Sequence, residues 1–340
     1  MASSQENLMI GAGLNMSRQL GVEPDSASSN GSEIVQMPTG IPICSKDLVS
    51  ISAGLRHSVF VFNDGKVLAA GDDRNDQIGG NQKKIYQIPT EVKISNEKIV
   101  QAACGQYYTA YLTENGQILI HGWRNIGQQH VVNLPAKFVF IAAGFDAPVA
   151  IDSEGALYIF DTYYTKEPIK VAGEKPFYDV AKGSDFILAI DVTGAVYGSG
   201  SLNNGSNDYK LFKKFENLRA DRVFACYETG ALLDNGKAYL LNSSHEFELV
   251  EAIQDKKIEF MDVGKFYCLF ITAENELYGL GTNTNGELML GKAEDNPVAM
   301  TRGPFQKMKL NFVKCGTHHS FAIVNGTPVE HRGAKAFNVK

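Results

Sequence analysis

One spacing of glycines recurs along most of this chain and constrains its fold more than any other feature. The segment VSISAGLRHSVFVFNDGKVLAAG ends at Gly71, and IVQAACGQYYTAYLTENGQILIHG ends at Gly122. Each contains an apolar run that ends in glycine, an alternating run, an acidic or Asn turn with glycine, and a third run that ends in glycine. Such self-similarity indicates a fold built from one supersecondary unit used several times.

The register of the repeat can be counted from its glycines. A second glycine follows the first after 11 residues, and a third follows after 6 more. The copies, some with substitutions, are Gly54, Gly65, Gly71; Gly105, Gly116, Gly122; Gly144, Gly155, Asp161; Gly183, Gly194, Gly200; Ala225, Gly236, Asn242; and Gly264, Asn275, Gly281. A seventh, partial copy runs from Gly316 to Gly326 and is one residue short. The first positions lie 51, 39, 39, 42, 39 and 52 residues apart, which suits propeller blades of about four short strands.

Each unit has the composition of β-strands rather than of a helix. The runs alternate and are rich in Val, Ile, Phe and Tyr, and Asp-Gly or Asn-Gly turns lie between them, which is the strongest short hairpin signal. The glycines allow positive φ angles or close backbone approach where a larger residue would not fit. The sequence therefore predicts an all-β fold.

The N-terminal segment supplies the half-unit that the C-terminal copy lacks. The spacing Gly13-x-Asn15-x-x-x-Gln19-Leu20-Gly21 matches Gly71-x-Asp73-x-x-x-Gln77-Ile78-Gly79. Pairing the N-terminal strands with the C-terminal half-blade would close a seven-bladed β-propeller and hide its exposed sheet edges. We expect a single propeller over residues 7–328, with residues 22–48 as the outer crossing of the closing blade. Residues 1–6 and 329–340 are expected to be short tails.

Net charge, hydropathy and cysteine spacing argue against nucleic acid, membrane or zinc as the binding partner. The formal net charge is −6, so the chain has no overall attraction for nucleic acid or an anionic membrane. No run approaches the length of about 18 apolar residues that a bilayer requires, and the N-terminus lacks the features of a secretory signal. The 5 cysteines are widely spread without a C-x-x-C pair, which favours a reducing compartment, the cytoplasm or nucleus, and offers no zinc-ligand spacing.

The repeat resembles that of the regulator of chromosome condensation family. The resemblance is carried by Gly54-Leu55-Arg56-His57-Ser58, Gly316-Thr317-His318-His319-Ser320, Gly13 to Gly21, and Gly281 to Leu288. It covers about residues 7–328 and implies a seven-repeat propeller, although Asp161 and Asn242 replace expected glycines and the middle repeats are short. The chain is identified as a divergent member. Because one fold carries many activities, the resemblance is weaker for function.

The third position after each repeat glycine holds a candidate structural contact. His57 and His319 occupy it, and the equivalents counted from the sequence are Tyr108, Ala147, Phe186, Glu228 and Tyr267. A hydrogen-bonding or packing role repeated in each blade explains the position better than catalysis or metal binding does.

The cysteines and glycine loops give no sign of chemistry. Cys104 and Cys315 precede repeat glycines and Cys226 follows Ala225, so we expect small buried residues near the inner strands. No G-x-x-x-x-G-K-[ST], G-x-S-x-G or H-E-x-x-H pattern occurs. We predict no catalytic residue, no metal site and no cofactor, while dispersed carboxylates leave a propeller hydrolase as a remote alternative.

The turns at one face of the propeller are the candidate binding site. Successive turns of an up-and-down blade alternate between its faces, so the second residue after each repeat glycine should contribute to a ring around the channel mouth. These residues are Arg56, Tyr107, Asp146, Asp185, Tyr227, Phe266 and His318. They vary among aromatic, charged and polar types, which suits binding more than a repeated structural duty. Trp123, Arg124, Tyr163 and Tyr164 are expected on outer loops of the same face.

These features favour a non-catalytic protein-interaction module or adaptor that is monomeric on its own. The partner would be another protein, such as a small GTPase or a multi-subunit complex, without direct nucleic-acid binding or membrane attachment. The resemblance also implies an alternative, a guanine-nucleotide exchange factor for a Ran-like GTPase. Against exchange, the 39-residue spacings leave little room for the β-wedge of the family's exchange factor. A photoreceptor role is excluded because it needs clustered tryptophans and the chain has 1.

Overall fold

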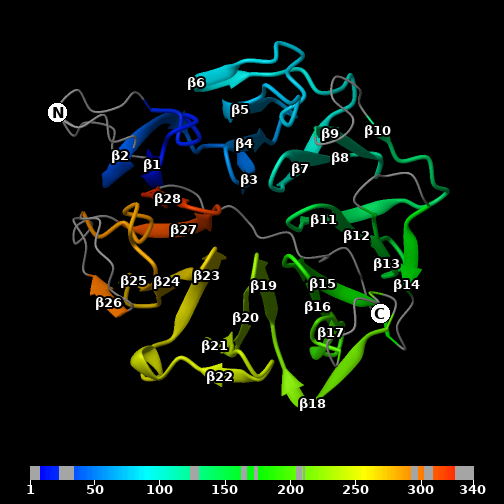
Figure 1. Cartoon of the computed structure of the whole chain (residues 1–340), viewed down its shortest axis with the longest axis vertical. Helices are drawn as coiled ribbons and strands as arrows, with labels where there is room; N and C mark the ends of the chain where they lie inside the picture. Colours follow the sequence, from blue (N-terminus) through cyan, green and yellow to red (C-terminus); the bar gives the residue numbers. More distant parts are fainter. Residues whose placement is uncertain are drawn as a thin grey trace.

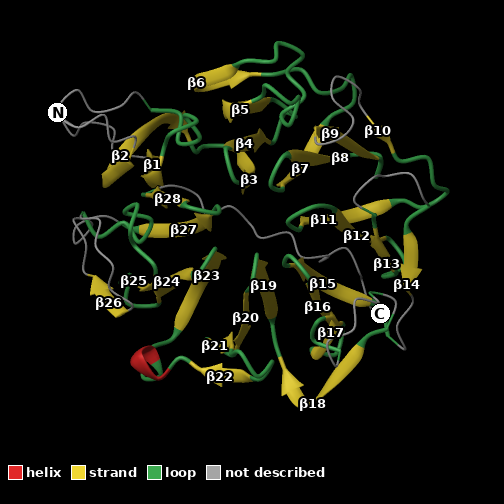
Figure 2. Ribbon diagram, viewed as in Figure 1, coloured by secondary structure: helices red, strands yellow, loops and turns green. Residues whose placement is uncertain are grey.

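Seven four-stranded antiparallel sheets are arranged around a central channel, as the computed structural model shows (Figure 1). The structure describes residues 8–22, 34–122, 130–161, 167–171, 175–203, 209, 211–291, 298–301 and 309–325. Each sheet forms one blade with its first strand at the channel and its fourth at the rim (Figure 2). The predicted seven-bladed β-propeller is confirmed.

The strands of blades 1 to 4 follow one another along the chain. They are β3 (Leu48–Ala53), β4 (His57–Phe62), β5 (Val67–Asp72) and β6 (Ile85–Glu91); β7 (Ile99–Cys104), β8 (Tyr108–Thr113), β9 (Ile118–Gly122) and β10 (His130–Val131); β11 (Phe138–Ala143), β12 (Pro148–Asp152), β13 (Leu157–Ile159) and β14 (Ile169–Val171); and β15 (Phe177–Lys182), β16 (Phe186–Asp191), β17 (Ala195–Gly200) and β18 (Lys213–Arg219).

Blades 5 and 6 continue this order, and blade 7 combines the two ends of the chain. The strands are β19 (Arg222–Cys226), β20 (Thr229–Asp234), β21 (Lys237–Leu241) and β22 (Phe247–Leu249); β23 (Ile258–Gly264), β24 (Tyr267–Thr272), β25 (Leu277–Gly281) and β26 (Val298–Thr301); and β27 (Leu310–Cys315), β28 (His319–Val324), β1 (Leu8–Leu14) and β2 (Ile34–Cys44). A short 3-10 helix, η1 (Glu251–Ile253), follows β22.

Strand β1 closes the ring as the sequence predicts. It lies between β28 and β2 in the sheet order β2-β1-β28-β27. Its residues Leu8 to Gly13 pair with Val324 to His319, and its other edge pairs with β2. Both edges of this N-terminal strand are therefore hydrogen-bonded, and the first and last parts of the chain form one blade.

Apolar side chains fill every junction between neighbouring blades. Among the described residues, one cluster spans blades 1 and 2, and the equivalent clusters span each following pair around to blades 7 and 1. At the closing junction, Met9, Phe60 and Phe321 are 0% exposed, and the two phenyl rings meet edge to face at 5.4 Å. Burying one such side chain contributes about 1.5–3 kcal/mol, so each blade is stabilised mainly by its two neighbours.

The third glycine of the repeat is required by backbone geometry. Gly71 has φ 102°, and an added Cβ would lie 2.3 Å from the Arg56 carbonyl oxygen. Its amide neighbour Asp72 donates to that carbonyl at 2.8 Å. In blade 3, where Asp161 replaces this glycine, β13 already ends at Ile159. The substitution therefore coincides with a shorter third strand.

Blade 5 differs by one residue from the register counted on the sequence. Asp234 pairs directly with Lys237, so Asn235 and Gly236 form a two-residue turn. In blade 1 the Phe62 amide instead donates to Lys66 across three residues. Counting back 11 residues from Gly236 therefore places the repeat position one residue too early. The pairing of Cys226 with Thr229 shows that Cys226, not Ala225, occupies the position of the repeat glycine.

Candidate functional site

The third-position residues His57, Tyr108 and His319 link their blades to the next one, and the structural role predicted for them is confirmed. His57 Nε2 lies 2.8 Å from Thr109 Oγ1 of blade 2, and His319 Nε2 lies 2.9 Å from Ser58 Oγ of blade 1. The Tyr108 hydroxyl donates to the Gly144 carbonyl at 3.1 Å. These side chains belong to the scaffold and are buried.

The register correction in blade 5 brings another residue into this set. Thr229, rather than the predicted Glu228, follows Cys226 by three residues. Its hydroxyl oxygen accepts a hydrogen bond from the Phe266 amide of blade 6 at 2.9 Å. The third position of blade 5 therefore also contacts the next blade, which sequence counting missed because the Asn235-Gly236 turn is short.

Seven two-residue turns, here called the turn ring, connect the first and second strands of the blades at one face. They are Leu55-Arg56, Gln106-Tyr107, Phe145-Asp146, Ser184-Asp185, Tyr227-Glu228, Lys265-Phe266 and Thr317-His318. Backbone hydrogen bonds join neighbouring turns, namely Gln106 to Phe145, Phe145 to Gly183, Ser184 to Tyr227, Lys265 to Thr317, and Thr317 to Gly54. Backbone hydrogen bonds therefore connect the turns of blades 2 to 5 and, separately, those of blades 6, 7 and 1.

In four of the seven turns the first residue, and not the predicted second one, lines the channel. Gln106, Phe145, Tyr227 and Thr317 line the central cavity, and all four are first-turn residues. Of the predicted ring, only Tyr227 lines this cavity, and it does so because blade 5 is shifted by one residue. Glu228 takes the second position there.

Two aromatic rings that line the channel contact each other at this face. Phe145 and Tyr227 meet edge to face at 4.8 Å, although blade 4 separates their blades. Tyr227 also lies under the Lys265 ammonium, 4.8 Å from its ring centre. Burial, as the main cause, raises the pKa of Tyr227 to about 12, opposed by a side-chain hydrogen bond with Thr317. The phenol is thus neutral at physiological pH.

The outer positions of the turn ring are available for contacts. Arg56 and Asp185 are exposed, and Phe266 is 50% exposed. Tyr107, Asp146 and His318 are half-buried. The predicted residues Trp123, Arg124, Tyr163 and Tyr164 lie outside the described residues.

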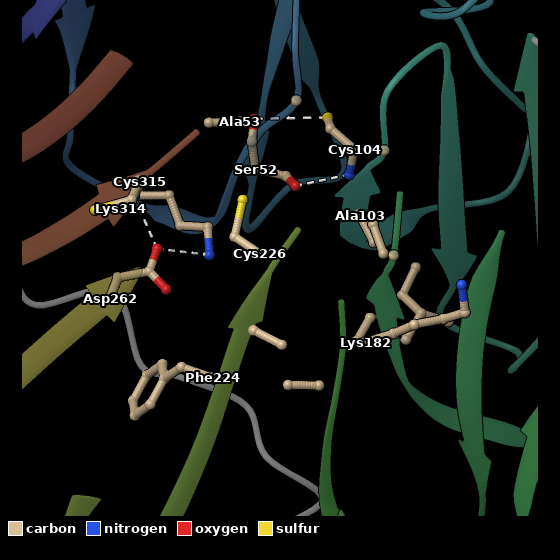
Figure 3. Close-up of a pocket in the computed structure, with 18 of the residues that line it drawn as sticks. Ser52, Ala53, Ala103, Cys104, Lys182, Phe224, Cys226, Asp262, Lys314 and Cys315 are labelled. Carbon is tan, nitrogen blue, oxygen red and sulfur yellow. Dashed lines mark hydrogen bonds and ion pairs between the residues drawn. The ribbon is translucent and has the colours of Figure 1, made fainter. Parts of the chain in front are cut away.

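A cavity of about 180 Å³ occupies the channel, and the inner strands of all seven blades line it together with Phe145 and Tyr227. Its ionic groups are paired, as Figure 3 shows for Lys314 and Asp262. Lys314 Nζ lies 2.8 Å from Asp262 Oδ2, which also accepts the Cys315 amide at 2.7 Å. Lys182 Nζ lies 2.7 Å from Asp146 Oδ1. These charges neutralise one another.

The channel cysteines are poor nucleophiles. Burial raises the pKa of Cys104 to about 11 and of Cys226 to about 12, so both remain thiols at neutral pH. Cys104 and Cys315 are buried as predicted. Cys226 is only half-buried, because it replaces a repeat glycine and borders the cavity. No group of three or more His, Cys, Asp or Glu side chains suited to a metal ion occurs in the described ranges.

None of the helices in the described part of the chain has the length and apolar character that a membrane crossing requires.

Comparison with known proteins agrees with the repeat and the architecture. Two descriptions of the regulator of chromosome condensation (RCC1) repeat match residues 64–112 and 48–77. The mouse regulator of chromosome condensation is 24% identical over 358 residues, which cover 84% of this chain and 85% of the relative. The chain is a divergent member of the RCC1-repeat family. The structure of Prp20p from Saccharomyces cerevisiae has a TM-score of 0.77 at 15% identity and covers 94% of this chain and 92% of that chain.

Other relatives in this family differ in size and role. Human E3 ubiquitin-protein ligase HERC2 is 22% identical over 298 residues, covering 81% of this chain but 6% of the relative. The bovine secretion-regulating guanine nucleotide exchange factor is 27% identical over 189 residues, covering 46% of this chain and 41% of the relative. This chain thus spans a small part of the ligase and less than half of that exchange factor. The family places it among regulatory RCC1-type modules.

Proposed function

We propose that this chain is a non-catalytic protein-interaction module that binds its partner through the turn ring. One observation carries the proposal: hydrogen bonds connect turns whose outward side chains differ from blade to blade. These outward side chains are exposed or half-buried, whereas third-position side chains such as His57, Tyr108 and His319 are buried in contacts with the next blade. Arg56 and Phe266 are exposed anchors of the kinds that dominate binding energies. The proposed compartment is the cytoplasm or nucleus.

Alanine substitution of Arg56, Tyr107 and Phe266 should weaken binding of the natural partner without unfolding the protein. Truncating a hot-spot aromatic or Arg costs at least about 2 kcal/mol, or roughly thirty-fold in affinity. The measurement is affinity purification of the intact chain from its own cells with quantitative mass spectrometry, followed by titration of the recovered partner. Thermal melts check that each variant is folded.

The matched control set lies on the opposite face. Asp64, Glu114 and Glu154 are exposed residues of the turns between second and third strands. Alanine at these three positions should leave partner recovery nearly unchanged. If the control set abolishes binding while the turn-ring set does nothing, the opposite face is the binding surface.

A second candidate is nucleotide exchange on a Ran-like GTPase, favoured by the similarity to the bovine exchange factor. The solved relative Prp20p is described by its binding to Gsp1p and histones. Exchange would require loops that open a nucleotide site without covalent chemistry. We expect little acceleration when stopped-flow fluorescence follows release of a labelled nucleotide from Ran at micromolar protein, because the short middle repeats leave little room for a wedge. A large acceleration would favour nucleotide exchange over partner binding alone as the function of this chain.

A further inference from the structure

Three consecutive turns form a continuous arc on the turn ring. The Lys265 amide of blade 6 donates to the Thr317 carbonyl of blade 7 at 3.3 Å, and the Thr317 amide donates to the Gly54 carbonyl of blade 1 at 3.1 Å. The outward residues of this arc are Phe266, His318 and Arg56. Because the backbone links are direct, these side chains project from one ordered surface.

Lys265 is held in place by aromatic rings rather than by an acid. Its ammonium lies 4.8 Å from the Tyr227 ring centre and 5.3 Å from that of Phe266. Tyr227 is in turn fixed against Phe145 at 4.8 Å. Within the described ranges, Lys265 forms no ion pair. Stacking reduces the freedom of the lysine stem, so less entropy is lost when a partner group binds the ammonium.

Arg56 provides a second cation on the same arc. It is exposed and makes no ion pair in the part of the chain that the structure describes. The neighbouring carboxylate, Asp72, is already occupied by Arg74 at 2.7 Å. His318 lies between the two cationic turns, and burial followed by the charge of Lys265 lowers its pKa. The arc therefore presents two fixed positive charges at neutral pH.

The other side of the turn ring has the opposite charge. Asp185 of blade 4 and Glu228 of blade 5 are exposed, whereas Asp146 of blade 3 is neutralised by Lys182 at 2.7 Å. A partner that covers the whole ring meets cations on blades 6 and 1 and anions on blades 4 and 5. Such an arrangement favours one orientation and penalises like charges.

We infer that the arc of Lys265, Phe266, His318 and Arg56 is the docking site for a segment of a protein partner in which acidic side chains flank an apolar one. The inference rests on the proposed function and adds the chemistry of the partner. A carboxylate would bind the Lys265 ammonium, which pairs with no acid among the described residues, and a second would pair with Arg56. The half-exposed Phe266 ring would cover the apolar residue between them.

The probe is a fluorescein-labelled peptide of sequence Glu-Glu-Glu-Phe-Glu-Glu-Glu, titrated with the full chain by fluorescence anisotropy at low salt. Lys265→Glu should reduce its affinity at least tenfold, and Lys265→Met should reduce it less, because Met keeps the apolar stem without adding repulsion. Arg56→Glu should also reduce it. The matched control is Lys257→Glu, an exposed lysine at the opposite face, which should change the affinity less than twofold. Raising salt should weaken binding to the wild type more than to Lys265→Met.

The outcomes separate this inference from the proposed function. Loss of peptide binding in Lys265→Glu with retention in Lys257→Glu supports the acidic docking site. Equal binding in the wild type and both charge reversals, or an equal loss in Lys257→Glu, overturns it. The same variants are assayed for the natural partner recovered from cells. If alanine at Phe266 and Tyr107 removes that partner while Lys265→Glu retains it, the turn ring remains the interface and only the acidic chemistry is wrong.

Discussion

Removal of residues 1–21 should abolish the cooperative folding of the whole propeller, not just loosen one blade. The deletion removes β1, which is hydrogen-bonded to both β28 and β2, together with the buried side chains Met9 and Leu20. Strands β28 and β2 would then have unpaired edges, which invite aggregation. The neighbouring blades would also lose the apolar junction that stabilises them. Circular dichroism melts and size-exclusion chromatography measure the loss.

Single substitutions of two methionines also test whether β1 closes the propeller. Met9 is 0% exposed in β1, whereas Met16 is 61% exposed in the loop that follows. Met9→Ala should lower the free energy of unfolding by about 2–5 kcal/mol because it leaves a cavity, and Met16→Ala should change it by less than about 0.5 kcal/mol. A truncated chain with the parental midpoint and monomeric state, or equal effects of the two substitutions, would contradict closure by β1.

Acidification from pH 6.5 to pH 4 should destabilise the propeller through His57 and His319. Burial, the main cause, lowers the pKa of His57 to about 4 and that of His319 to about 3. The Nδ1 atom of each ring is buried without a hydrogen-bond partner. In this pH window the unfolded chain binds protons at these residues and the folded chain does not, so the free energy of unfolding falls as the pH falls. His57 alone should contribute about 3 kcal/mol between pH 7 and pH 4.

Two buried carboxyl groups act in the opposite direction. Burial is the largest cause that raises the pKa of Asp73 and of Asp179 to about 6. Below pH 6 the folded chain binds protons at these aspartates before the unfolded chain does, so they stabilise the fold as the pH falls toward about 4. The pKa shifts of His57 and His319 are larger than those of Asp73 and Asp179. We therefore expect the free energy of unfolding to fall on acidification.

Chemical denaturation at several pH values measures this balance. His57→Gln retains a side-chain N–H donor near Thr109 but cannot titrate. The free energy of unfolding of this variant should therefore depend less steeply on pH, with nearly one proton fewer taken up on unfolding than in the wild type. His245→Gln is the control, because His245 is exposed in the turn before β22. If His57→Gln and the wild type have the same slope between pH 4 and pH 6.5, His57 does not limit acid stability.

The sequence alone determined the blades and their closure because both depend on local spacing. Gly71 has a positive φ where the third strand passes the Arg56 carbonyl, and a side chain would not fit there. Glycine therefore recurs at this position in most blades, and the interval between these glycines can be counted in the sequence. The match between Gly13-x-Asn15 and Gly71-x-Asp73 identified the missing half-blade for the same reason. Each Asn15 or Asp73 side chain accepts an amide hydrogen bond within its own loop, from Leu20 and Ile78 respectively.

Only the tertiary structure decided which turn residues meet at the channel. The register of blade 5 depended on whether the turn at Gly236 has two or three residues, and both are compatible with Asp-Asn-Gly. The contact of Phe145 with Tyr227 joins blades that are not neighbours, so no spacing along the chain encodes it. The two rings that hold Lys265 likewise come from blades 5 and 6. Contacts across the ring arise only when all seven blades are assembled, because the position of each turn depends on the packing of the blades around it.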